Sequence, residues 1–277
     1  MGLRRDESGR LHIQSQLAAE SLMDKDLLAR TETEKVFRPM PDLNVIKLGG
    51  QSIIDRGGVV VLPLLEEIVA ARQEHKLLIM TGGGTRSRHA YAIALDLGMP
   101  TGVLAKLGAS ISEQNALMIS ILLAPHMGIK VGHDDVVKLP AHLALGAIPV
   151  MHAMPPYGLW EEPPLKGRIP PHRTDVGTFL TAEVIGAKSC ILVKDEIGLM
   201  TADPKKDPLA KFIPEIEVNE LMQMDLDDLP VERAMLQALA QSRTIHEVLI
   251  INGRVAGNLT RALNGENPGT RIYKKTS

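Results

Sequence analysis

Residues 44 to 52 decide the fold, and they read Asn44-Val45-Ile46-Lys47-Leu48-Gly49-Gly50-Gln51-Ser52. The first five have the composition of a buried strand that carries one lysine, and a buried ammonium group is costly unless an anion meets it. The two glycines that follow let backbone N–H groups approach an anion closely, and a helix starting beyond them would add positive potential. The stretch therefore predicts a phosphate-binding turn, although a lysine at an exposed strand end before an ordinary turn remains the alternative.

The composition is that of an ordinary globular protein. The chain has 277 residues, of which 44% are hydrophobic and 23% charged, so it is long enough to bury a substantial core. Its formal net charge of -2 gives no electrostatic basis for binding nucleic acid or an anionic membrane. We therefore expect neither as a partner, and we expect any bound anion to be held locally.

The single cysteine and the apolar runs bear on the compartment. Cys190 lies in the apolar run 190–193, which is more typical of a packed core residue than of a nucleophile or a metal ligand. One cysteine cannot form a disulfide within the chain, which favours a reducing environment. No apolar run has the length of a membrane span, and the first thirty residues are too charged for a secretory signal. We expect a soluble cytoplasmic protein.

From Asn44 onward, apolar runs of strand length alternate with helical patterns. This alternation predicts an α/β fold with three αβα layers around a mostly parallel sheet. Ligands of such sheets bind at the carboxyl ends of the strands, where both glycine turns, 49–50 and 82–84, are expected to lie. The predicted strands are 44–48, 76–80, 148–152, 190–194 and 248–252, and the predicted helices are 59–73, 86–97, 110–124, 176–185, 217–224, 231–241 and 259–264.

Residues 1–41 are polar and mixed in charge, and they form a predicted N-terminal arm that precedes a domain over 42–277. A weak amphipathic helix is expected around 15–28, where several leucines provide an apolar face. The segment could be a disordered tail, but those leucines favour an arm that packs on a neighbouring subunit.

Five motifs occur in an order that resembles the amino acid kinase family, which includes uridylate, carbamate and acetylglutamate kinases. The resemblance covers about residues 42 to 273 and implies an acceptor-binding or anion-binding half, 42–187, and a nucleotide-binding half, 188–277. The motifs are Lys47-Leu48-Gly49-Gly50, Thr81-Gly82-Gly83-Gly84, Arg173-Thr174-Asp175, Thr201-Ala202-Asp203-Pro204 and Gly269-Thr270-Arg271-Ile272.

The resemblance implies a site for ATP and Mg²⁺. Lys47 and Asp175 would be the catalytic residues, with Lys47 on the transferring phosphates and Asp175 orienting Lys47 or a water, since phosphoryl transfer depends on positioning and positive potential. Ile197 and Met200 replace an acidic and an aromatic residue of the family pattern, which bears on nucleotide affinity or base choice. The implied nucleotide-binding residues are Lys47, Gly49, Gly50, Gln51, Lys194, Asp195, Gly198, Asp203 and Pro204, and the implied anion-binding residues are Gly82, Gly83, Gly84, Arg86 and Arg173.

Within the family, the sequence is most similar to the branch that stores molybdenum or tungsten, through stretches such as Ile54-Asp55-Arg56-Gly57 and Pro155-Pro156-Tyr157. This likeness implies polyoxomolybdate or polyoxotungstate clusters in a cage that pairs the chain with a homologous alpha-type subunit, as a hetero-hexamer or a homo-hexamer. The candidate metal contacts are His133, His142 and His152, because imidazole can donate to oxo groups or ligate a metal. Each could instead be an exposed histidine or one satisfied in the core.

Two other functions are compatible with the same motifs. One is a working small-molecule kinase, such as a uridylate kinase, which the glycine turns with Lys47 and Asp175 would serve equally well. The other is a nucleotide-binding structural subunit with little chemistry of its own, which Ile197 and Met200 suggest.

Overall fold

The computed structural model describes residues 3–5, 7–9, 11–13, 36–203 and 206–275. The chain divides into two compact units, residues 1–37 and 38–277. In the first unit, β1 (Leu3–Arg5) and β2 (Leu11–Ile13) form an antiparallel pair that the sequence did not predict. The helix predicted over 15–28 lies outside the described residues.

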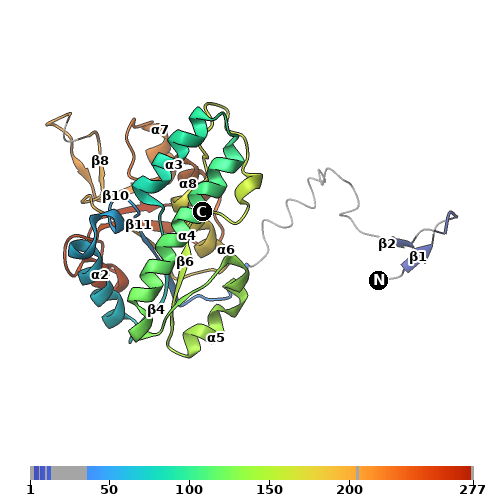
Figure 1. Ribbon diagram of the computed structural model, residues 1–277, viewed down its shortest axis with the longest axis horizontal. Helices are drawn as coiled ribbons and strands as arrows, with labels where there is room; N and C mark the ends of the chain where they lie inside the picture. Colours follow the sequence, from blue (N-terminus) through green and yellow to red (C-terminus); the bar gives the residue numbers. More distant parts are fainter. Residues whose placement is uncertain (1–2, 6, 10, 14–35, 204–205, 276–277) are drawn as a thin grey trace. The chain divides into compact units, whose positions relative to one another are not determined.

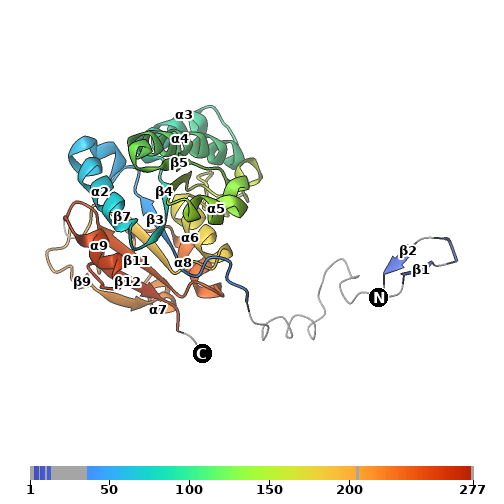
Figure 2. The same ribbon diagram turned by 90° about the horizontal axis from the view of Figure 1, so that it is seen from below.

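The second unit is built on an eight-stranded sheet with the order β10-β12-β11-β7-β3-β4-β6-β5 (Figures 1 and 2). Neighbouring strands pair in parallel except β11 and β12, so the predicted mostly parallel sheet is confirmed. A separate antiparallel hairpin joins β8 (Leu199–Met200) to β9 (Phe212–Ile213). The sheet strands are β3 (Leu43–Leu48), β4 (Lys76–Thr81), β5 (Gly128–Lys130), β6 (Ile148–His152), β7 (Ser189–Lys194), β10 (Glu215–Glu217), β11 (Glu247–Asn252) and β12 (Thr270–Tyr273).

Helices cover both faces of the sheet. Because side chains alternate along a strand, Val45 joins the core on one face and Ile46 the core on the other. The first core contains residues of α5 (Leu139–Ala144), α6 (Thr174–Val184), α7 (Val218–Gln223) and α8 (Arg233–Gln241). The second contains residues of α2 (Gly58–Ala71), α4 (Thr101–Leu122) and α9 (Asn258–Leu263), and α3 (Gly84–Asp96) packs on α4. The predicted three-layer arrangement is confirmed.

Short 3-10 helices complete the connections, and they are η2 (Ile54–Arg56), η3 (Ala124–His126), η4 (His133–Lys138) and η5 (Gly158–Trp160). One long helix differs from the prediction: α4 begins at Thr101, whereas the sequence pattern placed its start near residue 110.

The two glycine turns meet at the carboxyl edge of the sheet. A Cβ atom added to Gly50 would lie 2.1 Å from the Gly84 nitrogen, and one added to Gly82 would lie 2.6 Å from the Gly50 nitrogen. The backbones are therefore in direct contact, which only residues without side chains allow. This contact brings the ends of β3 and β4 together beside the end of β7 and shapes the functional site.

Candidate functional site

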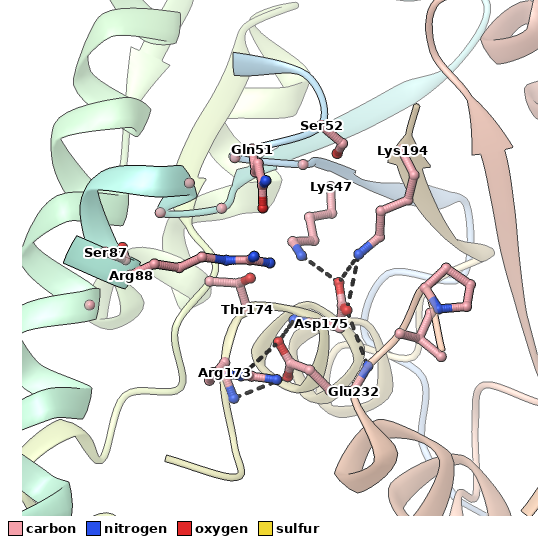
Figure 3. Close-up of a pocket in the computed structure, with 18 of the residues that line it drawn as sticks. Lys47, Gln51, Ser52, Ser87, Arg88, Arg173, Thr174, Asp175, Lys194 and Glu232 are labelled. Atoms are coloured by element: carbon pink, nitrogen blue, oxygen red, sulfur yellow. Dashed lines mark hydrogen bonds and ion pairs between the residues drawn. The ribbon is translucent and has the colours of Figure 1, made fainter. Parts of the chain in front are cut away.

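A cavity of about 830 Å³ opens at this carboxyl edge. Its walls come from both glycine turns, one side of α3, the start of α6, the end of β7 and the segment 228–232 before α8 (Figure 3). The cavity therefore lies where open parallel sheets bind ligands.

Two lysines and one aspartate form the charged centre of this cavity. Lys47 lies on β3, Lys194 ends β7, and Asp175 lies in the first turn of α6. The Lys47 ammonium donates to Asp175 Oδ1, and the Lys194 Nζ lies 3.0 and 3.1 Å from the two Asp175 carboxylate oxygens (Figure 3). Lys47 and Asp175 are each 3% exposed. One carboxylate thus faces two ammonium groups, and the excess positive charge suits an anionic ligand.

The ionisation of this centre follows from burial and charge. Burial alone would raise the pKa of Asp175, but Lys194 and Lys47 outweigh it and hold that pKa well below its usual value. Burial lowers the pKa of Lys47, and the Asp175 carboxylate opposes this shift. Asp175 is therefore ionised at neutral pH and acts as the counter-ion that aligns the lysines, since a carboxylate of such low pKa is a weak general base.

The turn after β3 presents free backbone donors. The Gly49 amide, expected on a phosphate, instead donates to the Val193 carbonyl at 3.0 Å. The amides of Gly50, Gln51 and Ser52 have no hydrogen-bond acceptor within the described residues, and all three residues line the cavity. Consecutive unpaired amides in a turn form an anion-binding concavity. The amides free to meet an anion therefore begin at Gly50, one residue later than the sequence indicated.

The wall opposite comes from α3. Ser87, Arg88 and Tyr91 line the cavity from this helix, and the Arg88 guanidinium reaches towards its centre (Figure 3). The buried Ser87 hydroxyl has no hydrogen-bond partner within the described part of the chain. Burial raises the pKa of Tyr91 to about 12, so its hydroxyl stays protonated. Arg86 lies outside the lining, because its guanidinium contacts Gln114 and Asn115.

Only some of the remaining residues that were expected to contact a nucleotide or an anion line the cavity. Besides those above, Gly82, Gly83, Gly84, Arg173 and Asp195 line the cavity. Gly198 does not line it, since it packs on Thr270 and Phe212 beside the β8–β9 hairpin, and neither does Asp203. Pro204 lies outside the described residues.

Glu232 and the segment before it were missed by the sequence reasoning. Residues 228–232 line the cavity from the start of α8. The only local signal is an acidic residue in the first turn of the helix predicted over 231–241, and such residues usually serve their own helix. Glu232 instead contacts α6, where it accepts a hydrogen bond from the amide of Asp175, 57 residues earlier in the chain.

A second, smaller cavity of about 110 Å³ contains two of the three candidate metal-binding histidines. His133 and His152 line it with their rings edge to face and their centroids 4.3 Å apart. Lys106, Ser110 and Glu113 of α4 complete the polar lining. His142 lies in α5 and does not belong to this cavity.

These two histidines are neutral donors or ligands at neutral pH. Burial, with His133 adding to it, lowers the pKa of His152 to about 4, and burial also lowers the pKa of His133. The buried His152 Nδ1 has no hydrogen-bond partner in the described part of the chain. No group of three or more His, Cys, Asp or Glu residues suited to a bare metal ion occurs among the described residues. The cavity thus combines one ammonium group, one carboxylate and two imidazoles.

The fold and the position of the site at the carboxyl edge of the sheet are those expected for the amino acid kinase family, and residues 42–252 match the model of that family. The chain belongs to that family, as the motifs predicted. It is 51% identical to the molybdenum storage protein subunit beta of Azotobacter vinelandii, over 92% of this chain and 95% of that protein. It is 27% identical to a uridylate kinase of Methanobrevibacter smithii, over 83% of this chain and 99% of that enzyme.

Solved structures agree in fold. The crystal structure of uridylate kinase from Archaeoglobus fulgidus matches with a TM-score of 0.64 at 21% identity, covering 83% of this chain and 99% of that one. At this identity the likeness concerns the fold alone. Among the described residues, no helix is both long and apolar enough to cross a membrane.

Proposed function

We propose that this chain is a molybdenum storage subunit that binds MgATP in the larger cavity and holds oxomolybdate, or its tungsten analogue, in the smaller one. The observation that carries the proposal is the pairing of a phosphate-type centre with a separate histidine cavity in a chain 51% identical to a molybdenum storage protein subunit beta. Loading of the metal oxoanion would use the free energy of ATP hydrolysis. The protein would be located in the cytoplasm.

The charged centre suits the phosphates of ATP. The free amides of residues 50–52 and the ammonium groups of Lys47 and Lys194 face the same cavity. In that position they would stabilise the charge that develops on the phosphoryl oxygens, while Asp175 keeps both lysines aligned. Mg²⁺, when bound, supplies further positive charge to the phosphates, and Asp195 and Asp228 offer the oxygen donors that it prefers.

The histidine cavity suits a single small oxoanion. Its volume of about 110 Å³ is roughly one eighth of the 830 Å³ of the larger cavity. A tetrahedral oxoanion fits that space, whereas a polynuclear cluster must grow out of it. Lys106 and Ser110 can donate to oxo groups, and the free Nδ1 of His152 can donate or ligate a metal. We infer that this cavity starts a cluster and does not enclose it.

The proposed partner is a homologous alpha-type subunit in a hexameric cage. The relative named as a subunit beta supports a partner of this kind. The structure offers an apolar stripe on α4 for the contact, formed by the exposed side chains of Leu117, Met118, Ile121 and Leu122. The same helix lines the histidine cavity, so a partner on this stripe would lie beside the growing cluster. Residues 1–41 would add a second contact as an arm.

Elemental analysis of the purified assembly after growth on molybdate tests the storage proposal. We expect many molybdenum atoms per chain, and fewer in a His133→Ala, His152→Ala double variant of equal stability. A metal content near zero in an intact assembly would sink the proposal.

A nucleoside monophosphate kinase is the second candidate. The 27% identical uridylate kinase favours it, and so do the unpaired Ser87 hydroxyl and the Arg88 side chain, which line the cavity opposite the turn 49–52. Release of ADP in the presence of a panel of nucleoside monophosphates separates the two functions. Sustained turnover that depends on one acceptor would favour the kinase.

A further inference from the structure

The N-termini of α6 and α8 cap each other across the larger cavity. Glu232 precedes α8, and its carboxylate accepts hydrogen bonds from the backbone amides of Arg173 at 3.0 Å, Asp175 at 3.1 Å and Val176 at 3.1 Å. In return, the Glu232 amide donates to Asp175 Oδ2 at 3.3 Å. A helix start leaves four amides without partners, so one remote carboxylate serves most of those of α6.

Glu232 is held there at a cost. The residue is 8% exposed, and its nearest cation, the Arg173 guanidinium, lies 3.7 Å away on a side chain that is 41% exposed. Burial, together with the Asp175 carboxylate, raises the pKa of Glu232. A buried carboxylate beside another carboxylate is unfavourable without compensation, and the amides of α6 provide it.

The consequence lies in how Asp175 is oriented. Its Oδ1 accepts hydrogen bonds from Lys47 and Lys194, and its Oδ2 accepts from Lys194 and from the Glu232 amide (Figure 3). A carboxylate constrained on both oxygens cannot rotate towards one lysine and release the other. The segment 228–231, which lines the cavity, leads directly into this contact.

We propose that Glu232 is a positioning residue: it fixes the first turn of α6 so that Asp175 holds Lys47 and Lys194 together, and it links the cavity wall 228–231 to the lysine pair. The expected effect of Glu232 on turnover rests on the proposed use of MgATP in the larger cavity. Its expected effect on the placement of Lys47 and Lys194 does not depend on that function.

The chain contains a matched control. Glu183 also accepts hydrogen bonds from three backbone amides, those of Arg243 at 2.6 Å, Thr244 at 3.1 Å and Ile245 at 2.8 Å, but it does not line the cavity. Glu232→Gln and Glu183→Gln each replace by an amide a carboxyl group that accepts from three backbone amides, at the start of α6 in the first case and in the loop before β11 in the second. A purely structural role predicts similar effects for both variants.

The test compares both variants with the wild-type chain in its native assembly. The first readout is the rate at which acetic anhydride modifies each lysine, measured by mass spectrometry. We expect Glu232→Gln to raise the rates at Lys47 and Lys194 at least threefold, with Glu183→Gln at the wild-type rates. Equal protection of both lysines in the two variants would overturn the assignment.

The second readout is MgATP hydrolysis. Since a misplacement of about 1 Å can cost about 100-fold in rate, we expect Glu232→Gln to lower kcat roughly 10- to 100-fold while KM changes much less, and Glu183→Gln to keep the wild-type kcat. Glu232→Asp, which keeps the charge, should recover part of the loss and serves if Glu232→Gln fails to fold. Wild-type kcat in Glu232→Asp and Glu232→Gln would also overturn the assignment. An inactive wild-type assembly with protected lysines would instead reject the proposed function and leave the positioning role supported.

Discussion

At the scale of single residues, Asp175 has the largest consequences because the buried Lys47 and the half-buried Lys194 both depend on it. Neither Lys47 nor Lys194 has another carboxylate partner among the described ion pairs. Breaking a buried pair leaves an uncompensated charge, whereas an exposed pair contributes little.

We therefore expect Asp175→Asn to lower the free energy of unfolding by about 3–5 kcal/mol, the range for a broken buried pair. The exposed pair of Lys76 and Asp42, with Nζ and Oδ2 2.6 Å apart, provides the control, and Asp42→Asn should cost less than about 1 kcal/mol. Urea denaturation of both variants measures the difference. Equal losses would contradict the assigned ion-pair centre.

His152 gives a pH dependence of stability. Its pKa of about 4 in the folded chain lies below the ordinary histidine value of 6.5, so the unfolded chain takes up the proton first as the pH falls. The stability from neutral His152 is complete above pH 6.5 and is lost as the pH falls towards 4. Between those values we expect His152→Gln to show a shallower loss than wild type, by at most about 1.4 kcal/mol per pH unit. Identical slopes in urea denaturation at several pH values would reject this.

Some residues of the site could be predicted from the sequence, and others could not. Lys47 is recognisable because a lone lysine in an apolar strand calls for an anionic partner, and Asp175 is recognisable only through its place in the order of the family's motifs. Glu232 is not recognisable, because its role depends on amides of another helix that only tertiary structure brings near. The Gly49 amide was misassigned for the same reason, since its acceptor lies on β7.

At the scale of elements, the contact between the two glycine turns organises the cavity. Gly50 cannot carry a side chain without displacing the backbone of Gly84. Gly58, at the start of α2, can carry a side chain, because an added Cβ would contact only Leu62, whose nearest atom would lie at an ordinary 3.5 Å.

We expect Gly50→Ala to lower the free energy of unfolding by about 1–3 kcal/mol, the cost of overpacking, and to weaken MgATP binding. Gly58→Ala should be neutral or slightly stabilising, because alanine reduces the entropy of the unfolded chain. Thermal unfolding and calorimetric titration of both variants provide the test. Unchanged ATP affinity in Gly50→Ala would contradict the assigned turn.

Element boundaries were predictable where the apolar pattern was regular, as in β3 and β6. The start of α4 was not, because Gly102 and Gly108 lower its helix propensity. The structure explains both glycines by close packing: an added Cβ would lie 2.1 Å from the Leu159 carbonyl oxygen at the first and 2.1 Å from the Tyr91 hydroxyl at the second. Short edge strands such as β5 and β10 depend on pairing with distant strands, which local sequence does not encode.

At the scale of the whole molecule, the apolar stripe on α4 is the feature that a single chain leaves unexplained. Clustered exposed apolar side chains mark interaction surfaces more often than scattered ones do. Ile121 is the most exposed member of the stripe, at 61%, and Val59, which lies on α2 outside the stripe, is 89% exposed.

We expect Ile121→Glu to shift the assembly towards smaller species, because the charge would be buried in the subunit contact. Val59→Glu should leave the assembly intact. Sedimentation velocity at equal protein concentration measures both. An Ile121→Glu variant that assembles like wild type would rule out the α4 stripe as the contact.

In the proposed function, ATP chemistry in the larger cavity drives metal into storage. The most direct measurement is elemental analysis of the metal-free assembly after incubation with molybdate, with MgATP, without it, and with MgATP after Lys47→Met substitution. The account predicts many molybdenum atoms per chain only for the wild-type assembly with MgATP. Equal loading without ATP, or full loading of the Lys47→Met assembly, would contradict it.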